Sequence, residues 1–285
     1  MFKNKKIALI GSGVMAEAIV AGLLRQNVAP AEGIVAAGPR ERRGKFLNQQ
    51  YGVRTFLQNS EAAAGAQVVV LSIKPQSLES VLVDLHDRLL EDALVLSIIA
   101  GAPIARIARG LNRRAVVRAM PNTPGRIGRG ITVWTASPEA NTEQKEMARR
   151  ILGALGEEIF LADEKFLDMA TALSGTGPAY VFLFMEALVD AGVHLGFPRR
   201  VAEQLVTETV RGSVEYYLTN SENQAAHLAG LRNDVTSPGG TTAAALYFLE
   251  KAGFRTALSR AVWAAYERSR ELGKDAEIHP PEPPG

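Results

Sequence analysis

The stretch Ile7-Ala8-Leu9-Ile10-Gly11-Ser12-Gly13-Val14-Met15-Ala16 decides the fold of this chain. Four apolar residues predict a buried strand, and the glycines after it predict a tight turn into a helix. Gly11 suits the turn, Gly13 lets the backbone approach a pyrophosphate, and Ala16 lets helix and strand pack closely. The phosphates would face the N-terminus of the helix. The turn is therefore predicted to bind a dinucleotide; a plain glycine-rich turn is the alternative.

Short β-branched runs alternate with helical patterns up to about residue 162. The strand candidates are residues 7–10, 33–37, 67–72, 93–98, 115–119, 131–135 and 158–161. Several of them are continuous apolar runs, which is typical of strands buried on both faces. Strands that alternate with helices predict βαβ units and a mostly parallel sheet. Residues 1–162 are therefore predicted to form an α/β, Rossmann-type dinucleotide-binding domain.

Helical patterns replace the strands after residue 163. The candidates are residues 180–195, 200–218, 224–232, 242–251 and 255–272. The first of these is apolar nearly all round, so we expect a helix buried on all sides, and a twofold oligomer would bury it more fully than one chain alone. Residues 163–275 are predicted to form an all-helical dimerisation domain, and residues 276–285, mostly Pro, Glu and Gly, a disordered tail.

Composition excludes several classes of function. The 285 residues suffice for two domains, and 32 Lys and Arg against 30 Asp and Glu leave a net charge of +2, which argues against nucleic acid. The lack of cysteine excludes disulfides and thiolate chemistry and fits a reducing compartment. Residues 7–24 imitate a signal peptide, but Glu17 and two glycines interrupt them, and no apolar run is long enough for a membrane span. We expect a cytoplasmic protein.

The end of the second predicted strand indicates which dinucleotide is bound. Enzymes that use NAD usually place an acidic residue there for the ribose 2′-hydroxyl. This chain instead has Ala37-Gly38-Pro39-Arg40-Glu41-Arg42-Arg43, and guanidinium groups pair well with a 2′-phosphate. The sequence thus predicts NADPH, with NADH possible. A solvated basic helix start is the alternative, which Glu41 partly supports.

A second glycine turn lies in the helical half. Ser237-Pro238-Gly239-Gly240-Thr241-Thr242 leads directly into a predicted helix. Adjacent glycines allow a sharp turn, and the start of a helix offers free N–H groups and the positive end of its dipole. We expect this turn to hold a carboxylate, while a capped loop between helices is the alternative.

Further motifs follow in a fixed order. They are Ser72-Ile73-Lys74-Pro75, Ala100-Gly101, Met120-Pro121-Asn122-Thr123-Pro124, Ala172-Leu173-Ser174-Gly175-Thr176-Gly177-Pro178-Ala179-Tyr180 and Gly196-Phe197-Pro198-Arg199. With the turn at residues 237–242 they resemble the pyrroline-5-carboxylate reductase family over residues 5–273. The resemblance implies reduction of 1-pyrroline-5-carboxylate to L-proline with NAD(P)H, the last step of proline biosynthesis. It also implies a homo-oligomer whose active sites are completed across the dimer.

The resemblance also implies roles for individual residues. Thr242 would be the catalytic residue and hydrogen-bond the ring nitrogen. The carboxylate would be held by Ser237 and the backbone of Gly239, Gly240 and Thr241, with Glu222 as a further substrate-side residue. The cofactor would be bound by Gly11, Ser12, Gly13, Val14, Met15, Ala16, Pro39, Arg40, Asn59, Ile73, Lys74, Pro75 and Ala100.

Two positions depart from the family's pattern. Leu228 stands where a proline is common, and Ala37-Gly38 lacks the Ser or Asn often found at the strand end. The first puts the start of the local helix in question. The second leaves more of the 2′-phosphate binding to Arg40.

Hydride delivery to an imine needs orientation and a polarised nitrogen but no metal, and none of the four His has the spacing of metal ligands. Lys74 or Tyr180 could alternatively donate a proton. A backbone turn is the better explanation for Lys74, and a position in the core or at an interface is the better explanation for Tyr180.

A 3-hydroxyacid dehydrogenase-like enzyme would need a Lys in the helical domain, which residues 168–232 lack. The remaining alternative is a non-catalytic, cofactor-sensing protein.

Overall fold

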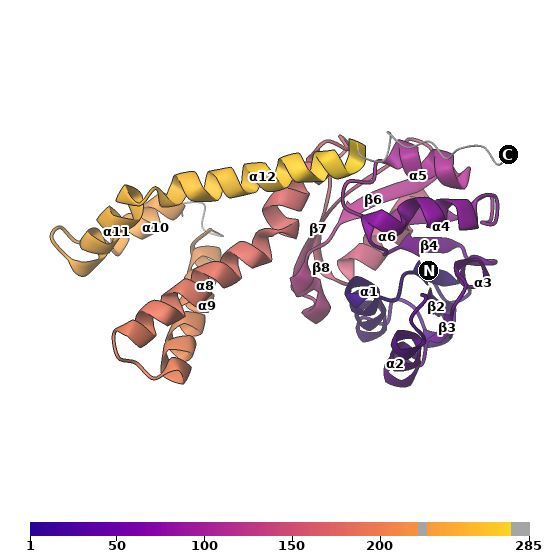
Figure 1. Cartoon of the computed structure of the whole chain (residues 1–285). Coiled ribbons are helices and arrows are strands. Elements are labelled where there is room, and N and C mark those ends of the chain that lie inside the picture. Colours follow the sequence, from indigo (N-terminus) through magenta and orange to yellow (C-terminus); the bar gives the residue numbers. More distant parts are fainter. Residues whose placement is uncertain (222–226, 275–285) are drawn as a thin grey trace. The chain divides into compact units, whose positions relative to one another are not determined.

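The computed structural model describes residues 1–221 and 227–274. Within these residues, eight strands form one sheet in the order β3-β2-β1-β4-β5-β6-β7-β8 (Figure 1). The strands are β1 (Ile7–Ile10), β2 (Ile34–Ala37), β3 (Arg54–Phe56), β4 (Val68–Leu71), β5 (Leu94–Ser97), β6 (Val116–Met120), β7 (Gly130–Ala136) and β8 (Gly156–Phe160). Only the β6–β7 pair is antiparallel. The predicted mostly parallel sheet is confirmed.

One strand, β3, lies outside the strands predicted from the sequence. It has three residues, forms one edge of the sheet and carries Arg54 on an exposed position. A short edge strand with one solvated face lacks the continuous apolar run that marks its neighbours. It pairs with β2 in parallel, so it extends the sheet on the side of the second βα connection.

Both faces of the strands β1, β2, β4 and β5 are buried, which explains their continuous apolar runs. Along β1, Ile7 and Leu9 pack into one core and Ala8 and Ile10 into the other. Helices α1 (Val14–Arg25), α2 (Glu41–Tyr51) and α6 (Thr142–Gly153) contribute to the first core. Helices α3 (Asn59–Ala63), α4 (Leu78–Leu85) and α5 (Ile104–Leu111) contribute to the second. The arrangement is the doubly wound α/β fold that βαβ units predict.

The remaining chain is helical. The elements are α7 (Phe166–Ala170), a π-helical turn (Thr171–Gly175), α8 (Gly177–His194), α9 (Arg199–Ser221), α10 (Leu228–Asp234), α11 (Thr241–Lys251) and α12 (Phe254–Lys274). The short α7 and the π-helical turn precede the first helix predicted here. The chain divides into two compact units, one of residues 1–178 with the residues from 264 onward and one of Ala179–Trp263.

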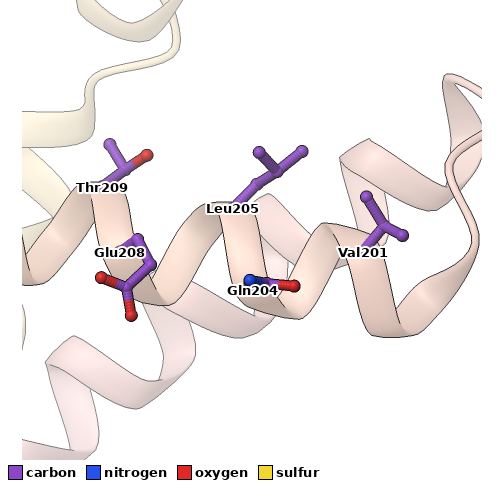
Figure 2. A pocket seen from close by; sticks show the side chains of 5 residues that line it. All are labelled: Val201, Gln204, Leu205, Glu208 and Thr209. Carbon is purple, nitrogen blue, oxygen red and sulfur yellow. The ribbon is translucent and has the colours of Figure 1, made fainter.

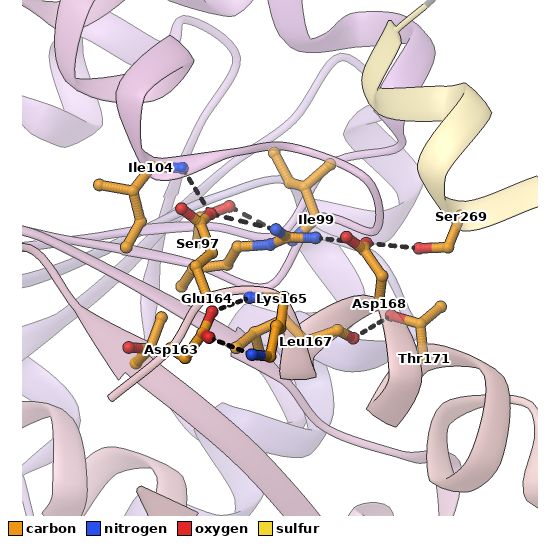
Figure 3. Close-up of polar contacts among 12 residues, drawn as sticks. Ser97, Ile99, Ile104, Asp163, Glu164, Lys165, Leu167, Asp168, Thr171 and Ser269 are labelled. Atoms are coloured by element: carbon orange, nitrogen blue, oxygen red, sulfur yellow. Dashed lines mark hydrogen bonds and ion pairs between the residues drawn. The ribbon is translucent and has the colours of Figure 1, made fainter. Parts of the chain in front are cut away.

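A buried polar network explains why residues 163–178 and the end of α12 group with the sheet (Figure 3). Arg118 of β6, which is 4% exposed, binds Glu164 at 3.0 Å and Asp168 at 2.8 Å. The Ser269 hydroxyl donates to Asp168 at 2.8 Å, and the backbone N–H of Ile104 donates to Glu164 at 2.8 Å. These contacts join segments that the predicted boundary at residue 162 separates. That boundary marks where the strands end, and the compact unit extends past it.

The helical unit exposes a large apolar surface. We predicted that α8 is buried on all sides, but in the single chain Val189 is its one buried residue, and Phe182 and Leu183 are 62% and 66% exposed. Residues 166–194, which include α8, form the stretch of the described chain that is long and apolar enough to span a membrane, a test that helices of soluble proteins also pass. An apolar surface of this kind marks an interaction site.

Candidate active site

The glycine turn between β1 and α1 has the geometry that its sequence predicts. Gly11 has a φ of +103°, and its N–H donates to the carbonyl of Ala37 at 2.9 Å. A Cβ at Gly11 would lie 2.6 Å from the carbonyl oxygen of Ser72. The Ser72 hydroxyl donates to the carbonyls of Gly11 at 2.9 Å and Ile10 at 3.2 Å. Neighbouring strands β2 and β4 therefore hold the turn from both sides.

Gly13 and Ala16 have the two other predicted roles. Gly13 caps the N-terminus of α1, and a Cβ built on it meets nothing within 4 Å. This open space above a helix N-terminus is where a pyrophosphate would approach the backbone, so the turn fits a dinucleotide. Ala16 is fully buried in the core between α1 and the sheet. Ser12 is buried as well, whereas Val14 is 50% exposed and Met15 half-buried.

The other predicted cofactor residues lie at the same edge of the sheet. Because β1 stands between β2 and β4, the carboxyl end of β1 is a topological switch point, where open α/β sheets bind ligands. The segments that follow the carboxyl ends of four parallel strands contain Gly11–Ala16, Pro39 and Arg40, Ile73–Pro75 and Ala100. The fold thus brings together residues as far apart in the sequence as Gly11 and Ala100.

Asn59 and Lys74 lie beside this edge. Asn59 begins α3 and its side-chain amide donates to the carboxylate of Asp84 at 3.1 Å. Lys74 is exposed, and its carbonyl accepts the N–H of Ser77 at 3.0 Å in a short 3₁₀ turn that starts with Pro75. This geometry agrees with the interpretation of Lys74-Pro75 as a backbone turn.

The basic segment after β2 divides into two kinds of arginine. Arg40 and Arg42 are exposed at the start of α2, with Arg40 as the N-cap residue. Arg43 is half-buried, and its Nε donates to the carbonyl of Ser12 at 2.8 Å while its guanidinium pairs with Glu17. The strand end itself carries no polar side chain, because a Cβ at Gly38 would overlap the Ser12 hydroxyl.

The second glycine turn lies in the helical unit. Gly239 has a φ of +71°, and the Gly240 N–H donates to the Ser237 carbonyl at 3.1 Å. Gly240 is the N-cap of α11, whose first intrahelical bond runs from Ala244 to Gly240. Helix geometry leaves the preceding N–H groups, including those of Thr241 and Thr242, without helical acceptors. This is the donor set that a carboxylate needs. Thr242 is half-buried and Ser237 exposed.

The neighbouring helix begins where the sequence departs from the family's pattern. α10 starts at Leu228, and the ring Nδ1 of His227 accepts the N–H of Ala229 at 3.2 Å. His227 is thus a helix cap, and a proline at residue 228 is not required for the helix to start. Glu222, the further substrate-side prediction, and the predicted tail at residues 276–285 lie outside the described residues.

No group of three or more potential metal ligands occurs among the residues that the structure describes. Two hollows contain none of the predicted site residues. One, of about 550 Å³, is lined by Val201, Gln204, Leu205, Glu208 and Thr209 along one face of α9 (Figure 2). The other, of about 840 Å³, is polar and lined by residues at the amino ends of β5 and β6, opposite the predicted cofactor edge.

Sequence reasoning assigned no role to Ser72, Glu17 or the Arg118 network. Ser72 belongs to a motif, but its hydroxyl contacts exist only because β1 and β4 are adjacent in the sheet. Glu17 interrupts an apolar run, and this pattern does not identify its partners. The sequence does indicate that Arg118 has a partner, because a charged residue in an otherwise apolar strand must be paired when it is buried.

Comparison with known proteins agrees with both halves of the fold. Residues 164–272 match the family model for pyrroline-5-carboxylate reductase dimerisation, and residues 6–101 match the one for NADP oxidoreductase, coenzyme F420-dependent. The pyrroline-5-carboxylate reductase of Synechocystis sp. is 42% identical over 94% of this chain and 98% of its own length. That of Pisum sativum is 39% identical over 93% and 95%.

A solved structure agrees as well. The pyrroline carboxylate reductase of Plasmodium falciparum with NADP bound superimposes with a TM-score of 0.87 at 32% identity, over 96% of this chain and 100% of that one. The predicted Rossmann-type domain with a helical dimerisation domain is thereby confirmed. With 42% identity over nearly the full length of a relative, the chain belongs to the pyrroline-5-carboxylate reductase family.

Proposed function

We propose that this chain reduces 1-pyrroline-5-carboxylate to L-proline with a nicotinamide dinucleotide, the last step of proline biosynthesis. The observation that carries the proposal is the similarity to pyrroline-5-carboxylate reductases over 94% of the chain. The glycine turns at Gly11–Ala16 and Ser237–Thr242, each of which leads into a helix N-terminus, support it. Neither a 3-hydroxyacid dehydrogenase-like enzyme nor a non-catalytic sensor is favoured by these comparisons. The lack of cysteine fits a cytoplasmic location, which we propose for this enzyme.

We propose NADPH as the preferred cofactor, with NADH as a weaker one. The N-terminus of α1 and the backbone of Gly13 would hold the pyrophosphate. The exposed guanidiniums of Arg40 and Arg42 would pair with the 2′-phosphate, and β2 ends without an acidic residue for a 2′-hydroxyl. Asn59, Ile73, Lys74, Pro75 and Ala100 would line the remainder of the cofactor.

The residues of the second turn would bind and orient the imine. The hydroxyl of Ser237 and the N–H groups at the start of α11 would hold the carboxylate. The hydroxyl of Thr242 would hydrogen-bond the ring nitrogen and so fix the imine carbon for attack. When bound, the reduced cofactor supplies the hydride. A cyclic imine is basic enough to be partly protonated near neutral pH, so a neutral hydroxyl suffices at this position.

Replacing Thr242 with Val should test this role, because Val keeps the β-branched shape and removes the hydroxyl. We expect kcat/KM for 1-pyrroline-5-carboxylate to fall by about 10- to 100-fold, the worth of one hydrogen bond to a charged group. The Kd of NADPH should stay within about twofold, since none of the proposed nucleotide-binding residues belongs to the Ser237–Thr242 turn. Thr219→Val on exposed α9 makes the same chemical change away from the turn and is the control. Unchanged turnover of Thr242→Val would remove this residue from the mechanism.

We propose that the chain is a homo-oligomer and that each active site combines the nucleotide turn of one subunit with the Ser237–Thr242 turn of its partner. The exposed apolar surface of α8 supports the oligomer, as does the match of residues 164–272 to a dimerisation family.

Mixing two impaired variants tests the shared site. Subunits with Gly13→Ala should bind the nucleotide poorly, and subunits with Thr242→Val lack the hydrogen bond to the imine. Random reassociation makes half of the dimers mixed, and each of these has one intact site, so about a quarter of wild-type activity should return. No recovery after verified subunit exchange would mean that each chain forms its site alone. A mass of 30.6 kDa by light scattering would exclude the oligomer itself.

A further inference from the structure

A cluster of three polar side chains lies behind the glycine turn, between α1 and α2. Arg43 of α2 pairs with Glu17 in the first turn of α1, and the hydroxyl of Tyr51 donates to the other Glu17 oxygen at 3.1 Å. The Nε of Arg43 donates to the carbonyl of Ser12 at 2.8 Å, and its Nη2 reaches that of Gly13 at 3.5 Å. One guanidinium therefore contacts both a carboxylate and the turn that should meet the pyrophosphate.

The cluster is largely shielded from water and firmly held. The side chains of Arg43 and Glu17 are 24% and 15% exposed. The Arg43 guanidinium lies 4.8 Å from the centre of the Phe46 ring, and that ring packs edge-on against Tyr51. Burial raises the pKa of Glu17, but the hydrogen bonds from Arg43 and Tyr51 outweigh it and hold that pKa below its usual range. Glu17 is accordingly ionised at neutral pH.

An ionised Glu17 would weaken the binding of a dinucleotide unless an opposite charge neutralises it. A carboxylate in the first turn of a helix suits the helix dipole. The same position lies close to the helix N-terminus, where a dinucleotide brings two phosphate charges, and like charges in a shielded place repel. Arg43 supplies the opposite charge and also contacts the carbonyls of Ser12 and Gly13 in the turn.

We propose that Arg43 is a positioning residue: it neutralises Glu17 and holds the glycine turn, and so strengthens the binding of NADPH and NADH alike. This inference rests on the proposed function of the turn. It divides the basic segment into two parts. Arg43 serves the pyrophosphate, which both nucleotides carry, and Arg40 and Arg42 serve the 2′-phosphate, which NADPH alone carries.

The test compares the Kd values of NADPH and NADH in four variants of the full-length protein, measured by titration calorimetry. Arg43→Ala should raise both Kd values by a similar factor of about ten or more, because it leaves Glu17 unpaired beside the phosphates. The pair Arg40→Ala and Arg42→Ala should raise the Kd of NADPH at least about tenfold more than that of NADH. Lys45→Ala removes a cation from the exposed face of α2, where it pairs with Glu41, and is the matched control.

The fourth variant separates neutralisation from a merely structural role. Glu17→Gln added to Arg43→Ala removes the unpaired charge without rebuilding the contacts to Ser12 and Gly13. We expect it to recover most of the lost affinity for both nucleotides. If Arg43→Ala fails to fold, this double variant, which leaves no unpaired charge, is compared with the wild type directly and should bind both nucleotides within about fivefold.

Three results would overturn the proposal. An effect of Arg43→Ala on NADPH alone would make Arg43 a 2′-phosphate ligand. Unchanged Kd values would deny it any part in binding. No recovery with Glu17→Gln would leave it a purely structural residue. If the glycine turn does not bind a dinucleotide at all, the result differs from all three, because the wild-type protein would then bind neither nucleotide.

Discussion

Replacing Arg118 with Met is expected to lower the free energy of unfolding by about 3–5 kcal/mol, the cost of removing one partner from a buried ion pair. Arg118 is 4% exposed and satisfies two carboxylates, Glu164 and Asp168. Met fills a similar volume, so the loss comes chiefly from two carboxylates that keep hydrogen bonds from Ile104 and Ser269 but lose their positive partner. Unfolding in urea, followed at one fixed protein concentration, measures the effect.

Two further variants test the cause of that loss. Asp168→Asn added to Arg118→Met replaces one uncompensated charge by an amide and should restore part of the stability. Arg149→Ala removes an exposed arginine that pairs with Glu146, and it should destabilise the protein far less than Arg118→Met, because water screens a surface ion pair. A loss of under 1 kcal/mol in Arg118→Met would show that water reaches the two carboxylates and that the network contributes little.

Replacing Gly11 with Ala should weaken nucleotide binding on the order of 100-fold, the effect of a displacement of about 1 Å in a positioning element. Gly11 has a φ of +103°, and a Cβ there would lie 2.6 Å from the carbonyl oxygen of Ser72 and 3.0 Å from Ile73. The backbone of the turn must move, since the atom that it meets is itself backbone. We also expect a loss of about 1–3 kcal/mol in stability without nucleotide, from the strained conformation.

Gly13→Ala should behave differently. The experiment therefore compares the stability and the nucleotide affinity of the Gly11 and Gly13 variants. A Cβ at Gly13 meets nothing within 4 Å in the protein, so the variant should unfold like the wild type. It should still lose nucleotide affinity, because the methyl group occupies the space where the pyrophosphate approaches. Gly153→Ala, also open at its Cβ, controls for the change of residue type. Equal destabilisation of the Gly11 and Gly13 variants would contradict the separate roles.

Much of the fold follows from patterns within short windows of sequence. Seven of the eight strands occur where apolar runs predict them, and β1 with the turn after it determines the domain type. The exception is β3, whose residues Arg54-Thr55-Phe56 gain strand structure from pairing with β2 and not from their own pattern. Helices α8, α9, α10, α11 and α12 likewise overlap the predicted ranges, although residues 224–226 of the third range lie outside the described residues. The short α7 and the π-helical turn were not among the predicted helices.

The candidate site was predictable in part. The residues of the two glycine turns are recognisable because backbone geometry and helix termini make demands on residue type at fixed spacing. The side chains that contact these turns cannot be recognised from the sequence. Arg43 was predicted as one of three phosphate-binding arginines, yet it contacts Glu17, 26 positions away. Nothing in the segment 39–43 distinguishes it from Arg40 and Arg42 by sequence alone.

The sequence by itself determined the domain types, the dinucleotide turn, the second glycine turn and the family resemblance, because each depends on local periodicity or spacing. The tertiary structure alone decided which charges meet. Arg118 binds two carboxylates 46 and 50 positions away, and Ser269 reaches Asp168 across 101 positions. The sequence states that such charges exist, but ion pairing is a matter of distance and shielding, and only the packed chain determines both.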